Sequence, residues 1–128
     1  MWLVSGGAYQ GKLDYVMKKT GISLEEVADG ATCSLEEMFH KPVVNQFHMW
    51  IDRMLKENKE VSTMVQLLTE KNPEIIIIVN ELGCGVVPVE PYDRKYREVT
   101  GRICCELARN ANQVHRVICG IGTVIKHD

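Results

Sequence analysis

The sequence lacks any apolar segment that approaches the roughly 20 residues needed for a membrane-spanning helix. It also lacks the basic stretch that opens a secretory signal peptide, because its first apolar run follows directly after Met1. The sequence therefore predicts neither a membrane span nor a secretory leader. We expect a soluble, cytoplasmic protein that has no membrane partner.

An excess of positive charge is missing as well. The 128 residues include 15 Lys and Arg against 17 Asp and Glu, which gives a formal net charge of −2, and no basic run stands out. Proteins bind nucleic acid largely through basic side chains that neutralise phosphates. The sequence thus predicts no nucleic-acid partner.

The cysteine pattern excludes two further classes of protein. The five cysteines are an odd number and include no Cys-x-x-Cys pair, which argues against a disulfide framework and against a zinc site. Cys104 and Cys105 are adjacent in a predicted helix, so their side chains point in different directions. We expect most of the thiols to be small buried hydrophobic groups.

What the sequence does contain is a glycine turn after a short apolar strand at its start. The length predicts one domain over residues 1–128, and Gly6, Gly11 and Lys12 have the spacing of a phosphate-binding loop, G-x-x-x-x-G-K. In such a loop, backbone N–H groups converge on phosphate oxygens and the lysine reaches the outer phosphates. The predicted phosphate-binding residues are Gly6, Gly7, Ala8, Tyr9, Gln10, Gly11, Lys12 and Leu13.

Leu13 departs from this motif, which has Ser or Thr there to bind Mg²⁺ through its hydroxyl. The alternative interpretation of the stretch is an ordinary strand–turn–helix with two glycines. Farther on, Ser23 and Ser34 each begin a Ser-x-x-Glu pattern that is typical of a helix start. These patterns predict short helical turns separated at Asp29-Gly30, and the alternative makes 27–29 the end of a short strand.

Two amphipathic helices are predicted next. Pro42 suits a first helical turn, and apolar residues then recur at spacings of three and four: Val43, Phe47, Trp50, Ile51 and Met54. A second apolar stripe covers 61–68, and its helix stops at Asn72-Pro73. We interpret both stripes as core-facing. His40 and His48 are expected to be surface or half-buried helix residues.

The clearest strand covers 75–79, a continuous β-branched run typical of a central parallel strand that is buried on both faces. It leads into a polar, glycine-rich segment that contains Asn80, Glu81, Gly83 and Gly85. Ligands bind outside the carboxyl ends of the strands in open α/β sheets, so we expect Glu81 beside the first loop. A solvated turn carboxylate is the alternative for Glu81.

The last third predicts a helix from Tyr92 to Ala111. On it, Arg94 and Arg97 project to similar sides and could hold a phosphate or carboxylate, or could simply be solvated. A final strand is expected over 114–121, after which glycines turn the chain into 123–126. Strands that alternate with helices, without a hairpin signal, predict an α/β fold with a parallel sheet.

Several of these stretches together resemble one known family. They are Asn80-Glu81-x-Gly83-x-Gly85-Val86-Val87-Pro88, Arg94-x-Tyr96-Arg97-Glu98-x-x-Gly101, Ala108-x-x-Ala111, and Val117-x-x-Gly120-Ile121 with Lys126; Gly6-Gly7-Ala8 and Gly11-Lys12 are similar to its opening. The family is the bifunctional adenosylcobinamide kinase/adenosylcobinamide-phosphate guanylyltransferase of cobalamin biosynthesis. The resemblance covers about residues 1–19 and 75–126 and is most specific at 80–101.

The resemblance implies a three-layer P-loop (RecA-like) domain with a mainly parallel sheet, assembled as a homo-oligomer. It implies phosphorylation of the aminopropanol hydroxyl of adenosylcobinamide by GTP or ATP with Mg²⁺, followed by transfer of GMP through a guanylylated histidine. It carries over catalytic roles to Lys12 and Glu81, and a Mg²⁺ ligand to Asp29. Residues near the nucleotide and corrinoid cleft would be Asn80, Gly83, Gly85, Arg94 and Arg97.

Departures from the family's sequence pattern limit which of these activities we expect. Leu13 removes a Mg²⁺ ligand, and Cys104-Cys105 replaces an Asn-Gln pair. Nine residues separate Lys19 from Asp29 and none is a histidine, so the segment that holds the nucleophilic histidine is absent and the guanylyltransferase step is not expected. The hypotheses are a shortened cobinamide kinase, a homologue that binds a nucleotide or corrinoid without turnover, and a domain whose loop no longer binds phosphate.

Overall fold

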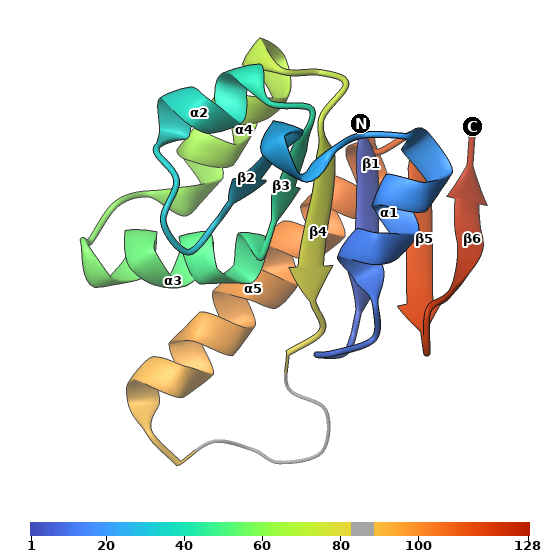
Figure 1. Ribbon diagram of the computed structural model, residues 1–128. Coiled ribbons are helices and arrows are strands. Elements are labelled where there is room, and N and C mark those ends of the chain that lie inside the picture. Colours follow the sequence, from blue (N-terminus) through green and yellow to red (C-terminus); the bar gives the residue numbers. More distant parts are fainter. Residues whose placement is uncertain (83–88) are drawn as a thin grey trace.

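The computed structural model describes residues 1–82 and 89–128, so Gly83 and Gly85 lie outside the described residues. These residues form a six-stranded sheet in the order β2-β3-β4-β1-β5-β6 (Figure 1). Its strands are β1 (Trp2–Gly6), β2 (Val27–Asp29), β3 (Val43–Asn45), β4 (Ile76–Asn80), β5 (Gln113–Ile118) and β6 (Ile121–His127).

The pairing of the strands explains their composition. β1 lies between β4 and β5 and pairs in parallel with both, and β4 also pairs in parallel with β3. The apolar residues 76–79 of β4 are therefore buried on both faces, as expected for a central parallel strand. The predicted mainly parallel sheet is confirmed.

Helices cover both faces of the sheet, which gives three layers. Figure 1 shows α1 (Lys12–Thr20) on the near face and α5 (Pro91–Asn110) behind the sheet. The α5 side also holds α2 (Leu35–His40), α3 (Phe47–Lys56) and α4 (Val61–Lys71). A short 3₁₀ turn covers Leu24–Glu26, before β2. The predicted α/β fold with helices on both faces is thus confirmed.

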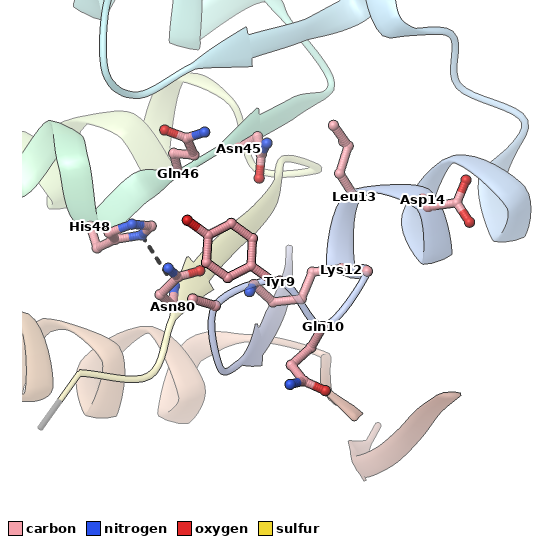
Figure 2. Close-up of a pocket in the computed structure, with 11 residues that line it drawn as sticks. Tyr9, Gln10, Lys12, Leu13, Asp14, Asn45, Gln46, His48 and Asn80 are labelled. Atoms are coloured by element: carbon pink, nitrogen blue, oxygen red, sulfur yellow. Dashed lines mark hydrogen bonds between the residues drawn. The ribbon is translucent and has the colours of Figure 1, made fainter. Parts of the chain in front are cut away.

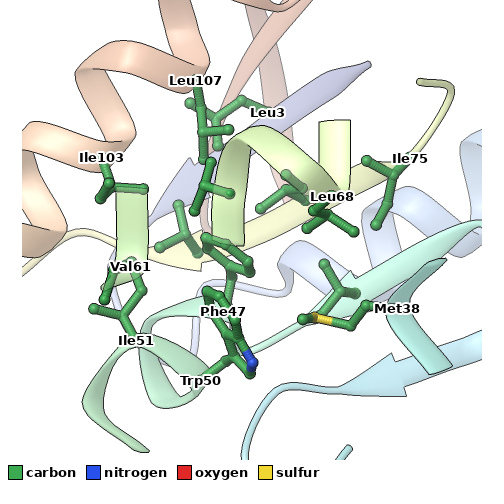
Figure 3. Close-up of a cluster of buried hydrophobic side chains, with 14 of the residues drawn as sticks. Leu3, Met38, Phe47, Trp50, Ile51, Val61, Leu68, Ile75, Ile103 and Leu107 are labelled. Carbon is green, nitrogen blue, oxygen red and sulfur yellow. The ribbon is translucent and has the colours of Figure 1, made fainter. Parts of the chain in front are cut away.

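The larger apolar core lies between the sheet and these four helices (Figure 3). Phe47 and Trp50 stack there with ring centroids 5.1 Å apart, and both are almost fully buried. Each large side chain buried in this way stabilises the fold by about 1.5–3 kcal/mol relative to its exposed state. The prediction that the stripe containing Phe47 and Trp50, now on α3, faces the core is confirmed. A smaller core, which includes Val4, Val16 and Ile78, packs beneath α1.

The structure corrects two sequence predictions for the segment that precedes α3. Ser23 and Ser34 do begin helical turns, yet the chain then forms a strand at Val27–Asp29, so the alternative interpretation holds there. The predicted helix start at Pro42 and Val43 is wrong. Val43–Asn45 is strand β3, because its two valines are fully buried between β2 and β4.

The predicted absence of a hairpin is also wrong. β6 runs antiparallel to β5 after a two-residue turn in which Cys119 has φ 50° and Gly120 has φ 77°. Two consecutive positive φ angles match the twist of a tight hairpin, but the usual sequence signal is Asn-Gly or Asp-Gly. The cysteine prediction fails in part as well: Cys33 is buried, whereas Cys105 and Cys119 are exposed.

Candidate functional site

The predicted phosphate-binding loop connects β1 directly to α1. Gly6 ends β1 so close to β5 that an added Cβ would lie 2.4 Å from the backbone oxygen of Val117. Gly11 precedes α1 with φ 81°, in the left-handed region where glycine carries no steric penalty. Both motif glycines therefore have a local steric reason to be glycine.

The loop borders a pocket of about 380 Å³, within the usual range for small-molecule sites. We call it the loop pocket (Figure 2), and its lining residues are Ala8, Tyr9, Gln10, Gly11, Lys12, Leu13, Asp14, Asn45, Gln46, His48 and Asn80. They come from the loop and from the carboxyl ends of β3 and β4, which is where open α/β sheets bind ligands. The loop and Asn80 thus lie together at one edge of the sheet.

Lys12 is almost fully buried at the base of this loop, with 7% of its surface exposed. Its Nζ donates a hydrogen bond to the backbone oxygen of Gly7 at 2.7 Å. Burial lowers the pKa of the Lys12 ammonium, and the neighbouring Glu81 carboxylate opposes that shift. The side chain is thus folded against its own loop, with its charge partly balanced by a carboxylate.

His48 is a site residue that the sequence interpretation missed. It lies in the first turn of α3, is 7% exposed, and its Nδ1 accepts a hydrogen bond from the backbone N–H of Asn80 at 3.1 Å (Figure 2). Burial, and then the charge of Lys12, lower the pKa of His48. A neutral ring whose Nδ1 accepts carries its proton on Nε2. Knowing that 43–45 is a strand would have placed this histidine at a strand end.

Glu81, which we expected beside the first loop, lies next to the end of β1, where its N–H donates to the backbone oxygen of Gly6 at 2.8 Å. Its carboxylate binds the Arg116 guanidinium through both oxygens, at 2.9 and 3.2 Å. Glu81 does not line the loop pocket. Its influence on Lys12 is therefore electrostatic, and Arg116, from β5, is a partner that the sequence interpretation did not anticipate.

Gln10 ties the loop to the β5–β6 turn. Its side-chain oxygen accepts from the Cys119 N–H at 2.6 Å, and its backbone oxygen accepts from the Gly120 N–H at 2.8 Å. Tyr9, next to it, is fully exposed and has φ 61°. The loop is thus fixed at Gln10 by the hairpin that the sequence interpretation overlooked.

The remaining predicted residues lie elsewhere. Asp29 ends β2, which is separated from β1 by β3 and β4, and its side chain accepts from the Ala31 N–H at 2.9 Å. Arg94 and Arg97 are in α5, outside the residues that line the loop pocket, and Arg94 donates to the backbone oxygen of Val89 at 3.2 Å. The structure therefore brings Lys12 and Asn80 to one pocket and leaves these three residues apart from it.

A second pocket, of about 330 Å³, lies between α5 and the sheet. Apolar groups from β1, β4, α5, β5 and β6 dominate its lining, which also includes Ser5, Asn80, Glu81 and Thr100. The Thr100 hydroxyl is buried and, within the part of the chain described, has no hydrogen-bond partner. We call this space the helix pocket.

Within residues 1–82 and 89–128, no group of three or more His, Cys, Asp or Glu side chains is arranged to hold a metal ion. In the same residues, no helix is both long enough and apolar enough to cross a membrane.

Residues 23–125 match the family model described as cobinamide kinase / cobinamide phosphate guanyltransferase. The chain is 33% identical over 69 residues to the bifunctional adenosylcobalamin biosynthesis protein CobU of Escherichia coli K12, which is 54% of this chain and 38% of that protein. It is 31% identical over 67 residues to the CobU protein of Salmonella typhimurium LT2, or 52% of this chain and 37% of that one.

The match thus spans little more than a third of the length of these curated relatives. The residues matched by the family model begin after the glycine loop and include 23–74, a region outside the resemblance noted from the sequence. The evidence for a phosphate site at Gly6–Leu13 is therefore the motif and its geometry. Because the family match covers most of the sequence, the chain belongs to the cobinamide kinase/cobinamide phosphate guanyltransferase family.

Proposed function

We propose that this protein binds a nucleoside triphosphate, GTP or ATP, in the loop pocket. The observation that carries the proposal is the burial of Lys12 at the base of a pocket formed by a glycine loop and two strand ends. A ligand phosphate offers Lys12 a stronger, charged acceptor in place of the Gly7 oxygen. Backbone N–H groups at the start of α1 add donors and the positive end of the helix dipole.

Two functions share this binding step. One is transfer of the terminal phosphoryl group to the aminopropanol hydroxyl of adenosylcobinamide, which the family supports. In that reaction Lys12 stabilises charge on the transferring group, and Glu81 acts through its effect on Lys12. Guanylyl transfer is not part of the proposal, because the histidine-bearing segment is absent from the sequence.

The second function is binding of a nucleotide or corrinoid without turnover, in partnership with a complete enzyme. Leu13 at the position of the usual hydroxyl residue and the amide side chains of Asn45 and Gln46 favour it. In either case we propose a cytoplasmic homo-oligomer. Light scattering coupled to gel filtration tests the assembly, and a monomer at all concentrations would contradict it.

Calorimetric titration with GTP and with ATP tests the binding step. Lys12→Met keeps the apolar stem and removes the charge, and we expect its dissociation constant to rise at least about tenfold, equal to 1.4 kcal/mol. Lys18→Met is the matched control, because Lys18 lies on the same helix but is exposed and paired with Asp14. Unchanged affinity in Lys12→Met, or no binding by the unaltered protein, would contradict the proposal.

A phosphorylation assay then separates the two functions. Purified protein is incubated with adenosylcobinamide and γ-labelled GTP or ATP, and label in the corrinoid fraction is measured. Transfer that is lost in Lys12→Met assigns the kinase reaction. Nucleotide binding with no transfer assigns the binding role, and co-purification with a full-length family member then tests the partnership.

A further inference from the structure

The loop pocket differs from a usual Mg²⁺–nucleotide site in its donor atoms. Such sites hold Mg²⁺ with the hydroxyl that follows the loop lysine and with a strand-end aspartate, together with phosphate oxygens. Here Leu13 follows Lys12, so the hydroxyl is missing. The neighbouring strand ends contribute Asn45 and Gln46 from the end of β3 and Asn80 from β4, all of them amides.

The carboxylates near the loop do not fill this role. Asp14 does line the loop pocket, but its carboxylate is exposed, pairs with Lys18 at 3.0 Å and points away from the His48 side of the pocket (Figure 2). Both oxygens of Glu81 bind Arg116, and Glu81 lines the helix pocket instead. Asp29 lies on β2 and caps its own turn. The sequence of residues 83–88 contains no Asp or Glu. The residues present therefore do not fit the Mg²⁺ ion that the family resemblance implies.

The same pocket is well supplied with hydrogen-bond donors. The Lys12 ammonium, the amide groups of Asn45, Gln46 and Asn80, and the ring of His48 all come from elements that border it. The His48 Nδ1 accepts from Asn80, which leaves Nε2–H as the donor of the neutral ring. Donors of this kind bind phosphate oxygens directly, whereas Mg²⁺ in nucleotide sites is held through one or two carboxylates together with phosphate oxygens.

We propose that the loop pocket binds the phosphates of its nucleotide directly, without Mg²⁺, through Lys12 and the surrounding neutral donors. This inference rests on the proposed nucleotide binding and deepens it. It assigns to Asn45 and Leu13 the loss of metal dependence, since these two positions border the pocket and carry a neutral amide and an alkyl side chain where a Mg²⁺ site has a carboxylate and a hydroxyl.

The test is calorimetric titration of the full chain with GTP and with ATP, in excess EDTA and in excess MgCl₂. We expect the affinity in MgCl₂ to be no more than about threefold higher than in EDTA. This difference corresponds to less than half of the binding free energy of a tenfold change. An affinity more than threefold higher in MgCl₂ overturns this inference and leaves the proposed function standing. No binding in either buffer overturns the proposed function, and the inference with it.

A gain-of-function variant tests the cause. Leu13→Ser combined with Asn45→Asp restores a hydroxyl and a carboxylate at the pocket, and we expect MgCl₂ to raise its nucleotide affinity at least about tenfold over EDTA. Asp29→Asn is the matched control, and its response to MgCl₂ should equal that of the unaltered chain. Far-ultraviolet circular dichroism checks that each variant is folded. A folded double variant that does not respond to MgCl₂ overturns the assignment to these two positions.

Discussion

The loop pocket and the helix pocket share strand ends but differ in chemistry. Asn80 lines both, and β1 leads into the loop of one while its Ser5 lines the other. The loop pocket is bordered by Lys12, amides and a histidine. The helix pocket is bordered mainly by apolar side chains of α5, β5 and β6. The difference comes from what covers each face, since the shared strands present alternate side chains to opposite sides.

The buried polar groups of the two pockets also differ in whether they have hydrogen-bond partners. In the loop pocket, Lys12 has a hydrogen-bond partner in Gly7 and His48 has one in Asn80. In the helix pocket, the Thr100 hydroxyl has none within the described residues. An unpaired buried hydroxyl costs free energy, whereas a paired one contributes a modest net amount. The comparison therefore predicts that the paired groups of Lys12 and His48 support the fold at the loop pocket and that the Thr100 hydroxyl does not support it at the helix pocket.

The largest effect on stability is expected at the end of β1, between Ser5, which lines the helix pocket, and the loop that borders the loop pocket. Gly6→Ala places a Cβ against the Val117 backbone oxygen, which cannot move without disturbing β5. We expect the free energy of unfolding to fall by about 1–3 kcal/mol, as in other overpacked sites. Denaturant unfolding measures this. Gly7→Ala is the control, because its Cβ would meet only Gln10 Cγ at 3.6 Å. Equal losses in the two variants would contradict the steric argument.

A smaller effect on stability is expected at His48, the histidine of the loop pocket. Its pKa is below the ordinary 6.5 in the folded state, because of burial and then Lys12. The unfolded chain therefore takes up a proton first as the pH falls below 6.5, so stability is lost as the medium becomes more acidic.

His48→Asn keeps an acceptor for the Asn80 N–H without this titration. We expect its unfolding free energy to fall less than that of the unaltered chain between pH 7 and pH 5, as followed by denaturant unfolding at each pH. Buried His115 also has a lowered pKa, so some acid sensitivity remains in the variant. Parallel pH profiles for the two proteins would contradict the prediction.

The smallest effect is expected at Thr100 in the helix pocket. Thr100→Val removes a hydroxyl without a partner, so the free energy of unfolding should stay the same or rise by up to about 1 kcal/mol. Thr20→Val is the contrast, because the Thr20 hydroxyl donates to Val16 and accepts from Ile22. That variant should lose about 0.5–1.5 kcal/mol in thermal or denaturant unfolding. A loss at Thr100 as large as that at Thr20 would show that its hydroxyl has a stabilising role.

Local sequence patterns predicted the elements with strong periodicity. The strand at 75–79, the helix after the glycine loop and the long C-terminal helix all form as expected. Patterns that are compatible with two structures were less informative. Val43 fits a helical stripe and also a buried strand, and its pairing with β4 in the sheet decided between the two. The Cys119-Gly120 turn has no usual hairpin signal, so its positive φ angles could not be anticipated.

The sequence by itself determined the family of the chain and the position of the glycine loop. Glycine spacing, a buried β-branched run and the motifs at 80–101 are local properties of the chain. Only the tertiary structure decided which residues surround Lys12. The strand order β2-β3-β4-β1 places Asn45, Gln46 and His48 at the loop and leaves Asp29 on the outer strand. Strand order follows from how all the elements pack together, so a local pattern can predict a strand end without showing which strand lies beside it.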